Sequence, residues 1–89
     1  MSTMGTSAAD MPGMATPAQL EQLRNAEGSE AESLYLKLMI RHHQGGIEMA
    51  QAALHLGRRP QILDLAQKTI DSQRSEITQM RKLLEQRHP

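Results

Sequence analysis

The side chains available to this chain favour helices over strands. It contains no Val, Phe or Trp and one Tyr, and its other β-branched residues are five Ile and five Thr. These residue types fill the pleated surface of a sheet, so their scarcity argues against an all-β or α/β fold. Apolar residues instead recur every three or four positions through most of the chain, which is the period of a helix. The pattern predicts an all-α protein.

Size and composition limit how such a protein is stabilised. The 89 residues include no Cys, which predicts one small domain with no disulfide and no zinc–thiolate site. A core of this size rarely supplies more than about 3–5 kcal/mol, so long packed helices, a metal or a partner chain must contribute. Ten basic residues balance ten acidic ones, so we expect no nucleic-acid partner. No apolar run approaches a membrane span, and no signal peptide is recognisable in the first 16 residues.

A change in composition divides the chain in two. Residues 1–15 contain no Leu or Ile and show no periodicity, and we interpret them as a flexible Met-rich tail or linker. The remainder, residues 16–88, is predicted to be a helical domain. Its helices are expected at about 17–27, 30–56 and 60–87, which gives a short helix followed by a long antiparallel hairpin.

Capping patterns suggest where the first two helices begin. Thr16 and Gln19 match a capping box, in which each side chain accepts a hydrogen bond from the backbone of the other residue. Ser29 and Glu32 match a second box, and Gly28 between the two helices is suited to ending the first one. The second box therefore predicts the start of the long helix.

The helix expected at 30–56 is apolar on two nearly opposite sides. Its narrow polar strip contains Lys37, Arg41, Gln44, Glu48, Gln51 and His55. One apolar face contains Leu34, Leu38, His42, Gly45, Met49, Ala52 and Leu56, and the other contains Leu36, Ile40, His43, Ile47, Ala50 and Leu54. The following helix has one apolar face and covers only one of these. We therefore expect a homodimer that forms a four-helix (ferritin-like) bundle, or a partner helical repeat that completes it.

Histidines and polar residues interrupt the apolar faces near the middle of the hairpin. His42 and His43 are adjacent and point about 100° apart, so they serve different faces of the helix. Antiparallel pairing sets residues near 42 opposite residues near 75, and we expect His42, Gln73 and Glu76 to meet there. Buried polar groups of this kind need partners.

Two consecutive glycines follow the histidines. Gly45 and Gly46 each cost a helix about 1 kcal/mol relative to Ala. We expect them to provide space, either for a close helix approach or for a ligand beside His42.

The same region resembles a known family. The string Leu-Met-Ile-Arg-His-His-Gln-Gly-Gly-Ile-Glu-Met-Ala at residues 38–50, and the later Gln-x-x-Glu-Ile-x-x-Met pattern, are similar to the bacterial domain of unknown function family 305. The similarity covers about residues 11–84. Members are typically exported and all-helical, often contain two copies of this unit, and some are linked to copper binding through His and Met. The resemblance implies the C-terminal repeat of a periplasmic or secreted protein, without its signal peptide and first repeat.

The resemblance also implies a set of metal ligands. The family's His pair and downstream Met correspond to His42, His43 and Met49, and its second pattern corresponds to Gln73, Glu76, Ile77 and Met80. We add Met39, one turn before His43, and assign Gln73 a supporting role beside the ligands. Copper suits this set, because thioethers favour Cu(I) and imidazole binds both oxidation states. The tail adds two Met-x-x-Met pairs as possible further ligands: Met1 with Met4, and Met11 with Met14.

Each of these ligands has a structural alternative. Met fills irregular gaps in a core, so Met49 and Met80 also fit plain helix packing. The tail methionines also fit a simple linker. His42 equally fits a satisfied core hydrogen bond, and His43 fits a dimer contact.

Three classes of function follow. The first is a non-catalytic, copper-binding protein of the bacterial cell envelope, involved in copper binding or tolerance. The second is a helical interaction module with no metal role, in which the polar core residues fix the register of the helices. The third is a histidine phosphotransfer module, because His42 precedes Gly46 by four residues on a long helix. No nucleophile motif or Gly-rich loop after a strand is present, so we expect no enzyme activity.

Overall fold

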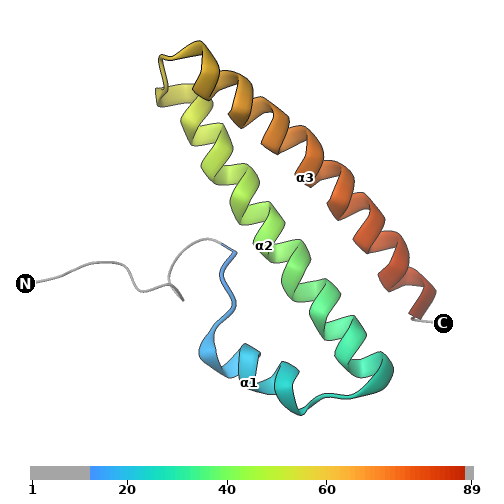
Figure 1. Ribbon diagram of the computed structural model, residues 1–89. Helices are drawn as coiled ribbons and strands as arrows, with labels where there is room; N and C mark the ends of the chain where they lie inside the picture. Colours follow the sequence, from blue (N-terminus) through green and yellow to red (C-terminus); the bar gives the residue numbers. More distant parts are fainter. Residues whose placement is uncertain (1–12, 88–89) are drawn as a thin grey trace, which may run out of the picture.

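The computed structural model describes residues 13–87, and these residues form three helices. α1 (Pro17–Asn25) is short, whereas α2 (Gly28–Leu56) and α3 (Pro60–Arg87) are long and antiparallel (Figure 1). No strand occurs within the described range. The predicted all-α fold, a short helix followed by a long hairpin, is therefore confirmed.

The start of α1 follows its predicted cap. The hydroxyl of Thr16 accepts a hydrogen bond from the backbone N–H of Gln19 at 3.1 Å, and the Gln19 side chain accepts one from the backbone N–H of Thr16 at 2.9 Å. Pro17 occupies the first helical position, where its missing N–H is not needed. α1 ends at Asn25, two residues before the predicted end, and none of its residues is buried.

The start of α2 differs from the prediction. The helix begins two residues early, at Gly28, whose φ of +59° is in the left-handed region that favours glycine. The Ser29–Glu32 capping box is wrong, because the N-cap is Glu27 and no side chain caps the helix. The carboxylate of Glu32 instead lies 2.7 Å from the guanidinium of Arg87 at the end of α3. A long-range ion pair has replaced the local cap.

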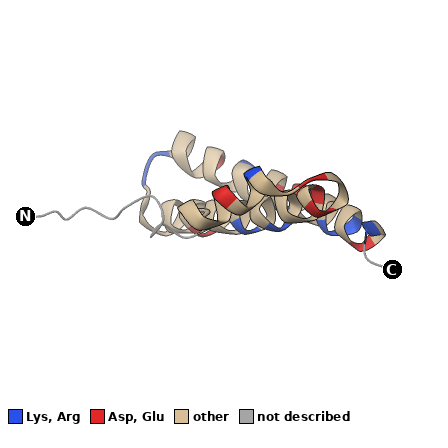
Figure 2. Cartoon of the chain, turned by 90° about the horizontal axis from the view of Figure 1, so that it is seen from below, with Lys and Arg blue, Asp and Glu red and all other residues tan. Residues whose placement is uncertain are grey.

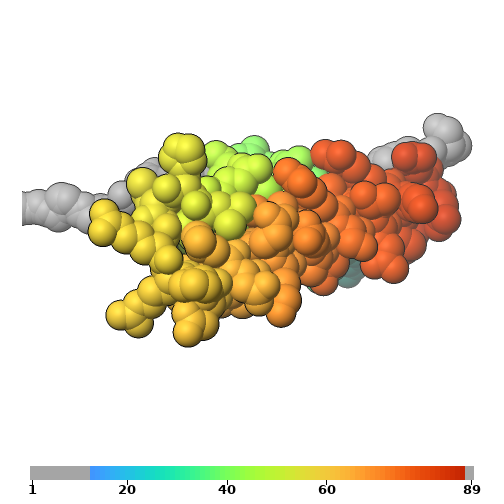
Figure 3. Space-filling model, turned by 90° about the horizontal axis from the view of Figure 1, so that it is seen from above, coloured from blue at the N-terminus to red at the C-terminus, as the bar shows by residue number. Residues whose placement is uncertain are grey.

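The core lies between α2 and α3, which run beside each other along the length of the molecule (Figures 1 and 3). Its buried hydrophobic residues are Leu36, Ile40 and Ala50 of α2 with Ala66, Ile70 and Ile77 of α3. Ile70 is the most buried of these, at 3% exposed. α3 therefore covers the predicted α2 face that contains Leu36 and Ile40, and leaves the other predicted face without a helix of the hairpin on it.

The described helices form a single layer. The molecule measures 45 × 38 × 15 Å, and its smallest dimension is close to the roughly 10–12 Å diameter of one helix with its side chains. The predicted polar strip of α2, from Lys37 to His55, is exposed at every position. Lys and Arg are interspersed with Asp and Glu along the helices, without a large patch of one sign (Figure 2). Among the described residues, no helix is long and apolar enough to cross a membrane.

The segment before α1 lies against α2 (Figure 1). Gly13 has a φ of +82°, and a Cβ atom at this position would overlap the carbonyl oxygen of Arg41 and lie 3.0 Å from the Cα of Gly45. Gly45 is buried by this backbone-to-backbone contact. Residues 13–15, which we predicted to belong to the flexible tail, are therefore placed beside the helix, because both segments lack side chains where they meet.

Candidate metal centre

His43 joins the two helices of the hairpin at mid-length. Its Nε2 atom lies 2.8 Å from Oε1 of Glu76, and its Nδ1 atom lies 2.8 Å from the backbone carbonyl oxygen of Met39. The expectation that His42 meets Glu76 is wrong. The predicted level along the hairpin was right, but α3 packs against the face of α2 that contains Leu36 and Ile40, and His43 belongs to that face.

The two contacts of the His43 ring determine whether either ring nitrogen is free to bind a metal ion. A carbonyl oxygen only accepts, so Nδ1 carries a hydrogen and donates it to Met39. Nε2 faces a carboxylate oxygen, and one proton between these two atoms completes the second hydrogen bond. Both ring nitrogens are thus engaged. A metal ion at Nε2 would have to replace the contact with Glu76.

Gln73 lies one turn before Glu76, beside the second glycine of α2. A Cβ atom on Gly46 would lie 2.5 Å from Oε1 of Gln73, so the glycine makes room for this side chain. Oε1 of Gln73 is buried and has no hydrogen-bond partner among the described residues. Both glycines provide space, as predicted, but neither predicted occupant fills it: the segment before α1 lies against Gly45, and the side chain of Gln73 lies against Gly46.

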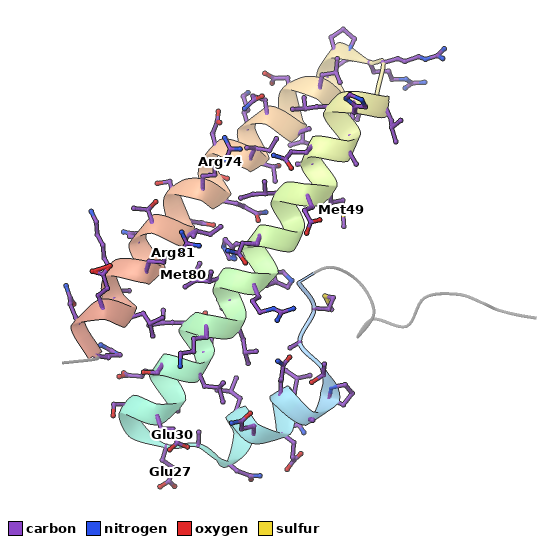
Figure 4. The ribbon with its side chains drawn as sticks, turned by 180° about the vertical axis from the view of Figure 1, so that it is seen from behind. Glu27, Glu30, Met49, Arg74, Met80 and Arg81 are labelled. Atoms are coloured by element: carbon purple, nitrogen blue, oxygen red, sulfur yellow. The ribbon has the colours of Figure 1, made fainter. Side chains whose placement is uncertain are left out.

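The candidate thioether ligands near the His43–Glu76 pair are half-buried. Met39 lies one turn before His43 on α2, and Met80 lies one turn after Glu76 on α3. Figure 4 shows Met80 on α3. His43, Glu76, Met39 and Met80 thus occupy neighbouring levels of the hairpin. Within residues 13–87, however, no three His, Asp or Glu side chains gather closely enough to hold a metal ion by themselves.

His42 is exposed and belongs to a different site. It lines a pocket of about 400 Å³ together with Met14, Met49, Gly45, Gly46, Glu48 and Ala52. Met49 is 63% exposed on the part of α2 near the segment before α1 (Figure 4). Met14 reaches the same pocket because the Gly13–Gly45 contact holds its neighbour against α2.

The predicted ligands therefore separate into two groups. One group is an imidazole with two thioethers: His42, Met49 and Met14. The other is the hydrogen-bonded pair of His43 and Glu76, with Met39 and Met80 nearby. The remaining tail ligands, Met1, Met4 and Met11, lie outside the described residues.

Sequence reasoning missed two features of the pocket. Glu48 lines it, although its helical position places it on the polar strip. Gly13 was treated as an ordinary linker residue, although it allows the backbone contact that brings Met14 into place. The available signal for the second was a lone glycine next to a candidate ligand in the Met-Pro-Gly-Met string.

Comparisons with known proteins agree on one family. The family model described as "Domain of unknown function (DUF305)" matches residues 1–84. Among solved structures, a DUF305 protein from Streptomyces coelicolor, whose name proposes that it is secreted, is similar with a TM-score of 0.82 and 42% identity, over 86% of this chain and 48% of that one. A DUF305 fragment from Deinococcus radiodurans is similar with a TM-score of 0.81 and 36% identity, over 94% of this chain and 56% of that one.

The aligned region spans about half the length of each of these two solved chains. No curated protein matches the chain. The family model covers nearly all of the sequence, and the fold agrees with both structures. This chain therefore belongs to the DUF305 family.

Proposed function

We propose that this protein binds Cu(I) without catalysing a reaction, and that Met14, His42 and Met49 are the ligands. The observation that supports the proposal is that these three side chains line one pocket, although Met14 comes from a segment far from the other two in sequence. Thioether sulfur is a soft donor that favours Cu(I), and imidazole nitrogen binds both oxidation states of copper, whereas Mg²⁺ and Ca²⁺ require oxygen ligands. The donor set of this pocket thus fits copper.

His42 is better suited to bind a metal than His43. The ring of His42 is exposed and has no hydrogen bond to another described residue, so a ring nitrogen is available as a ligand. Both nitrogens of His43 already have partners at 2.8 Å. We therefore assign the primary site to His42, and we propose His43 and Glu76, with Met39 and Met80, as a second and weaker site.

The tail is proposed to add donors to the primary site. Met11 precedes Met14 by three residues, and Met1 precedes Met4 by the same interval. Because Met14 already lies at the pocket, an additional thioether from Met11 needs to span only a short length of chain. Further thioethers would increase the preference for Cu(I) over Cu(II), since sulfur is the softer ligand.

We propose that Cu(I) binding by this protein serves copper binding or copper tolerance in the cell envelope. Support for this location comes from the Streptomyces coelicolor relative, whose name proposes secretion. A methionine-based site also suits an extracytoplasmic protein without Cys, because thioethers do not form disulfides in an oxidising compartment.

Titration of Cu(I) against a competing chelator tests the proposal. We expect micromolar or tighter binding, weakened about tenfold or more by Met14→Leu and by Met49→Leu, where about 1.4 kcal/mol corresponds to each factor of ten. These changes remove the sulfur and nearly preserve side-chain volume. Met80→Leu is the matched control and should leave the strongest site unchanged. Unaltered affinity in a His42→Ala, Met49→Leu double variant would overturn the assignment.

A helical interaction module remains the second candidate, and the His43–Glu76 pair favours it. A hydrogen-bonded pair at mid-length fixes the register of two antiparallel helices whether or not a metal binds. In this case, His43→Ala lowers the melting temperature of the metal-free protein and leaves Cu(I) affinity unchanged. Loss of Cu(I) binding in that variant would argue against a purely structural role.

A further inference from the structure

One broad side of the hairpin presents apolar side chains from both long helices. Tyr35 and Ala53 of α2 are 18 residues apart, which is five helical turns, so they point in the same direction. Leu65 and Leu83 of α3 have the same spacing. A groove near the turn between the helices contains both Ala53 and Leu65, and a second groove at the other end contains both Tyr35 and Leu83. Both grooves thus open on one side.

We call this side the open face and define it by Tyr35, Met49 and Ala53 of α2 with Ile62, Leu65 and Leu83 of α3. Apart from the half-buried Ala53, these residues are between 43% and 63% exposed. The groove near the turn has a volume of about 270 Å³ and a floor of small residues, among them Gly46, Ala50 and Ala66. A side chain from another molecule is able to enter it.

The other side of the hairpin is unlike the open face. Lys37 follows Tyr35 by two residues and therefore points about 200° away from it, and the rest of the polar strip of α2 lies on the same side as Lys37. Residues 13–87 form a single layer of helices with one polar side and one apolar side, and within this range no second layer buries the apolar side chains. The open face is therefore where a second layer belongs.

We propose that a second copy of this chain covers the open face and completes a four-helix bundle. In both solved relatives the aligned region is about half of the chain, so each has roughly as much chain again, enough for a second hairpin of this size. A second copy of these 89 residues brings a hairpin of the same size to the open face. The proposal concerns the metal-free protein and does not rest on the proposed copper function.

The size of the face is adequate for a stable dimer. The 28 residues of α3 extend about 42 Å at about 1.5 Å per residue, and two adjacent helices are about 20 Å wide. This footprint of about 800 Å² per copy equals the roughly 800 Å² per partner of standard protein interfaces. The core of such an interface is depleted in charge, and the charged groups nearest the open face are paired: Glu76 with His43, and Arg87 with Glu32.

Two-fold symmetry places the His43–Glu76 pairs of the two copies at the same level. Glu76 follows Leu65 by eleven residues, about three turns, and so points toward the open face. Two hairpins that overlap along their full length are related by a two-fold axis in the plane of the interface, which brings mid-length to mid-length. The two pairs, with Met39 and Met80 of each copy, are then enclosed in the centre of the bundle.

The oligomeric state of the full 89-residue chain in chelator-treated buffer tests this proposal. Light scattering should give twice the 9.9 kDa chain mass over the micromolar range. Leu65→Glu and Leu83→Glu, at opposite ends of the open face, should each weaken dimerisation about 100-fold or more, because each places a carboxylate in the apolar interface, where its desolvation is costly. Gln51→Glu adds the same charge on the polar strip and should leave the dimer intact.

Two further measurements keep the result decisive. Leu65 is 61% exposed, so the helical circular dichroism signal of Leu65→Glu should persist, which separates dissociation from unfolding. The ring signal of His43 should be shielded from a soluble paramagnetic agent in the wild type and accessible in Leu65→Glu. A monomeric wild type, a larger oligomer, or a dimer unaffected by both Glu substitutions would overturn the proposal. If the Leu65→Glu monomer still binds Cu(I), the proposed copper function does not depend on dimerisation.

Discussion

Gly13→Ala should detach the segment before α1 from α2 while leaving the helices folded. Gly13 has a φ of +82°, and a Cβ atom there would overlap the backbone oxygen of Arg41. The left-handed conformation alone costs an L-residue roughly 1–2 kcal/mol, and the overlap adds to this cost because backbone in the middle of a helix cannot move aside. The ratio of docked to detached segment should therefore fall about tenfold or more.

Gly28→Ala is the matched control for this substitution. Gly28 also has a positive φ, +59°, but a Cβ atom there would have no neighbour within 4 Å. This variant carries the conformational cost without the overlap. It should lower the free energy of unfolding by about 1 kcal/mol, since Gly28 begins α2, and should leave the pocket around Met14 unchanged.

The assay combines Met methyl NMR, thermal unfolding and Cu(I) competition. In Gly13→Ala, the Met14 methyl signal should move toward its value in a short unfolded peptide, and Cu(I) affinity should fall about tenfold if Met14 is a ligand. The melting temperature should change little, because Gly13 lies outside the helices. An unmoved Met14 signal would refute the docking argument, whereas a moved signal with unchanged affinity would refute only the role of Met14 in copper binding.

Further substitutions test the packing of the hairpin and the cap of α1. Ile70→Ala, at the position that is 3% exposed, should lower the free energy of unfolding by about 2–5 kcal/mol in denaturant titration, whereas Leu56→Ala, at 78% exposed and outside the open face, should cost clearly less. Gln73→Met should stabilise the protein by about 1 kcal/mol in the same titration, because it removes a buried oxygen that lacks a partner; destabilisation would show that this oxygen is satisfied. Thr16→Ala should lose about 1 kcal/mol of local stability at α1, detectable as faster amide exchange at Gln19, and unchanged exchange would contradict the observed cap.

Most of the fold was predictable because local signals determine it. Helical periodicity, the scarcity of sheet-forming residues and the break between the helices expected at 30–56 and 60–87 are sufficient to place the long hairpin. The capping box at Thr16 also formed as predicted, since both of its hydrogen bonds lie within one turn. The box at Ser29 did not form, because Glu32 pairs with Arg87 from the far end of α3.

The candidate site was less predictable. The residue types and their level along the hairpin were readable from the sequence, but the partner of Glu76 was assigned to the wrong histidine. Adjacent residues on a helix differ by about 100°, so which histidine faces α3 depends on which side of α2 packs against α3, and periodicity alone does not decide between two apolar sides. The position of Met14 beside His42 had no local signal other than the glycine that precedes it.

By itself, the sequence determined the helices, their order and the two apolar sides of α2, because these properties depend on residues a few positions apart. Only the tertiary structure decided which side α3 covers, which histidine meets Glu76, and that the segment before α1 brings Met14 to His42 and Met49. Those outcomes depend on how large surfaces fit together. The two glycines of α2 show the reason. Their cost to the stability of the helix is visible in the sequence, whereas the groups that pack against them, the backbone at Gly13 and the side chain of Gln73, come from other parts of the chain.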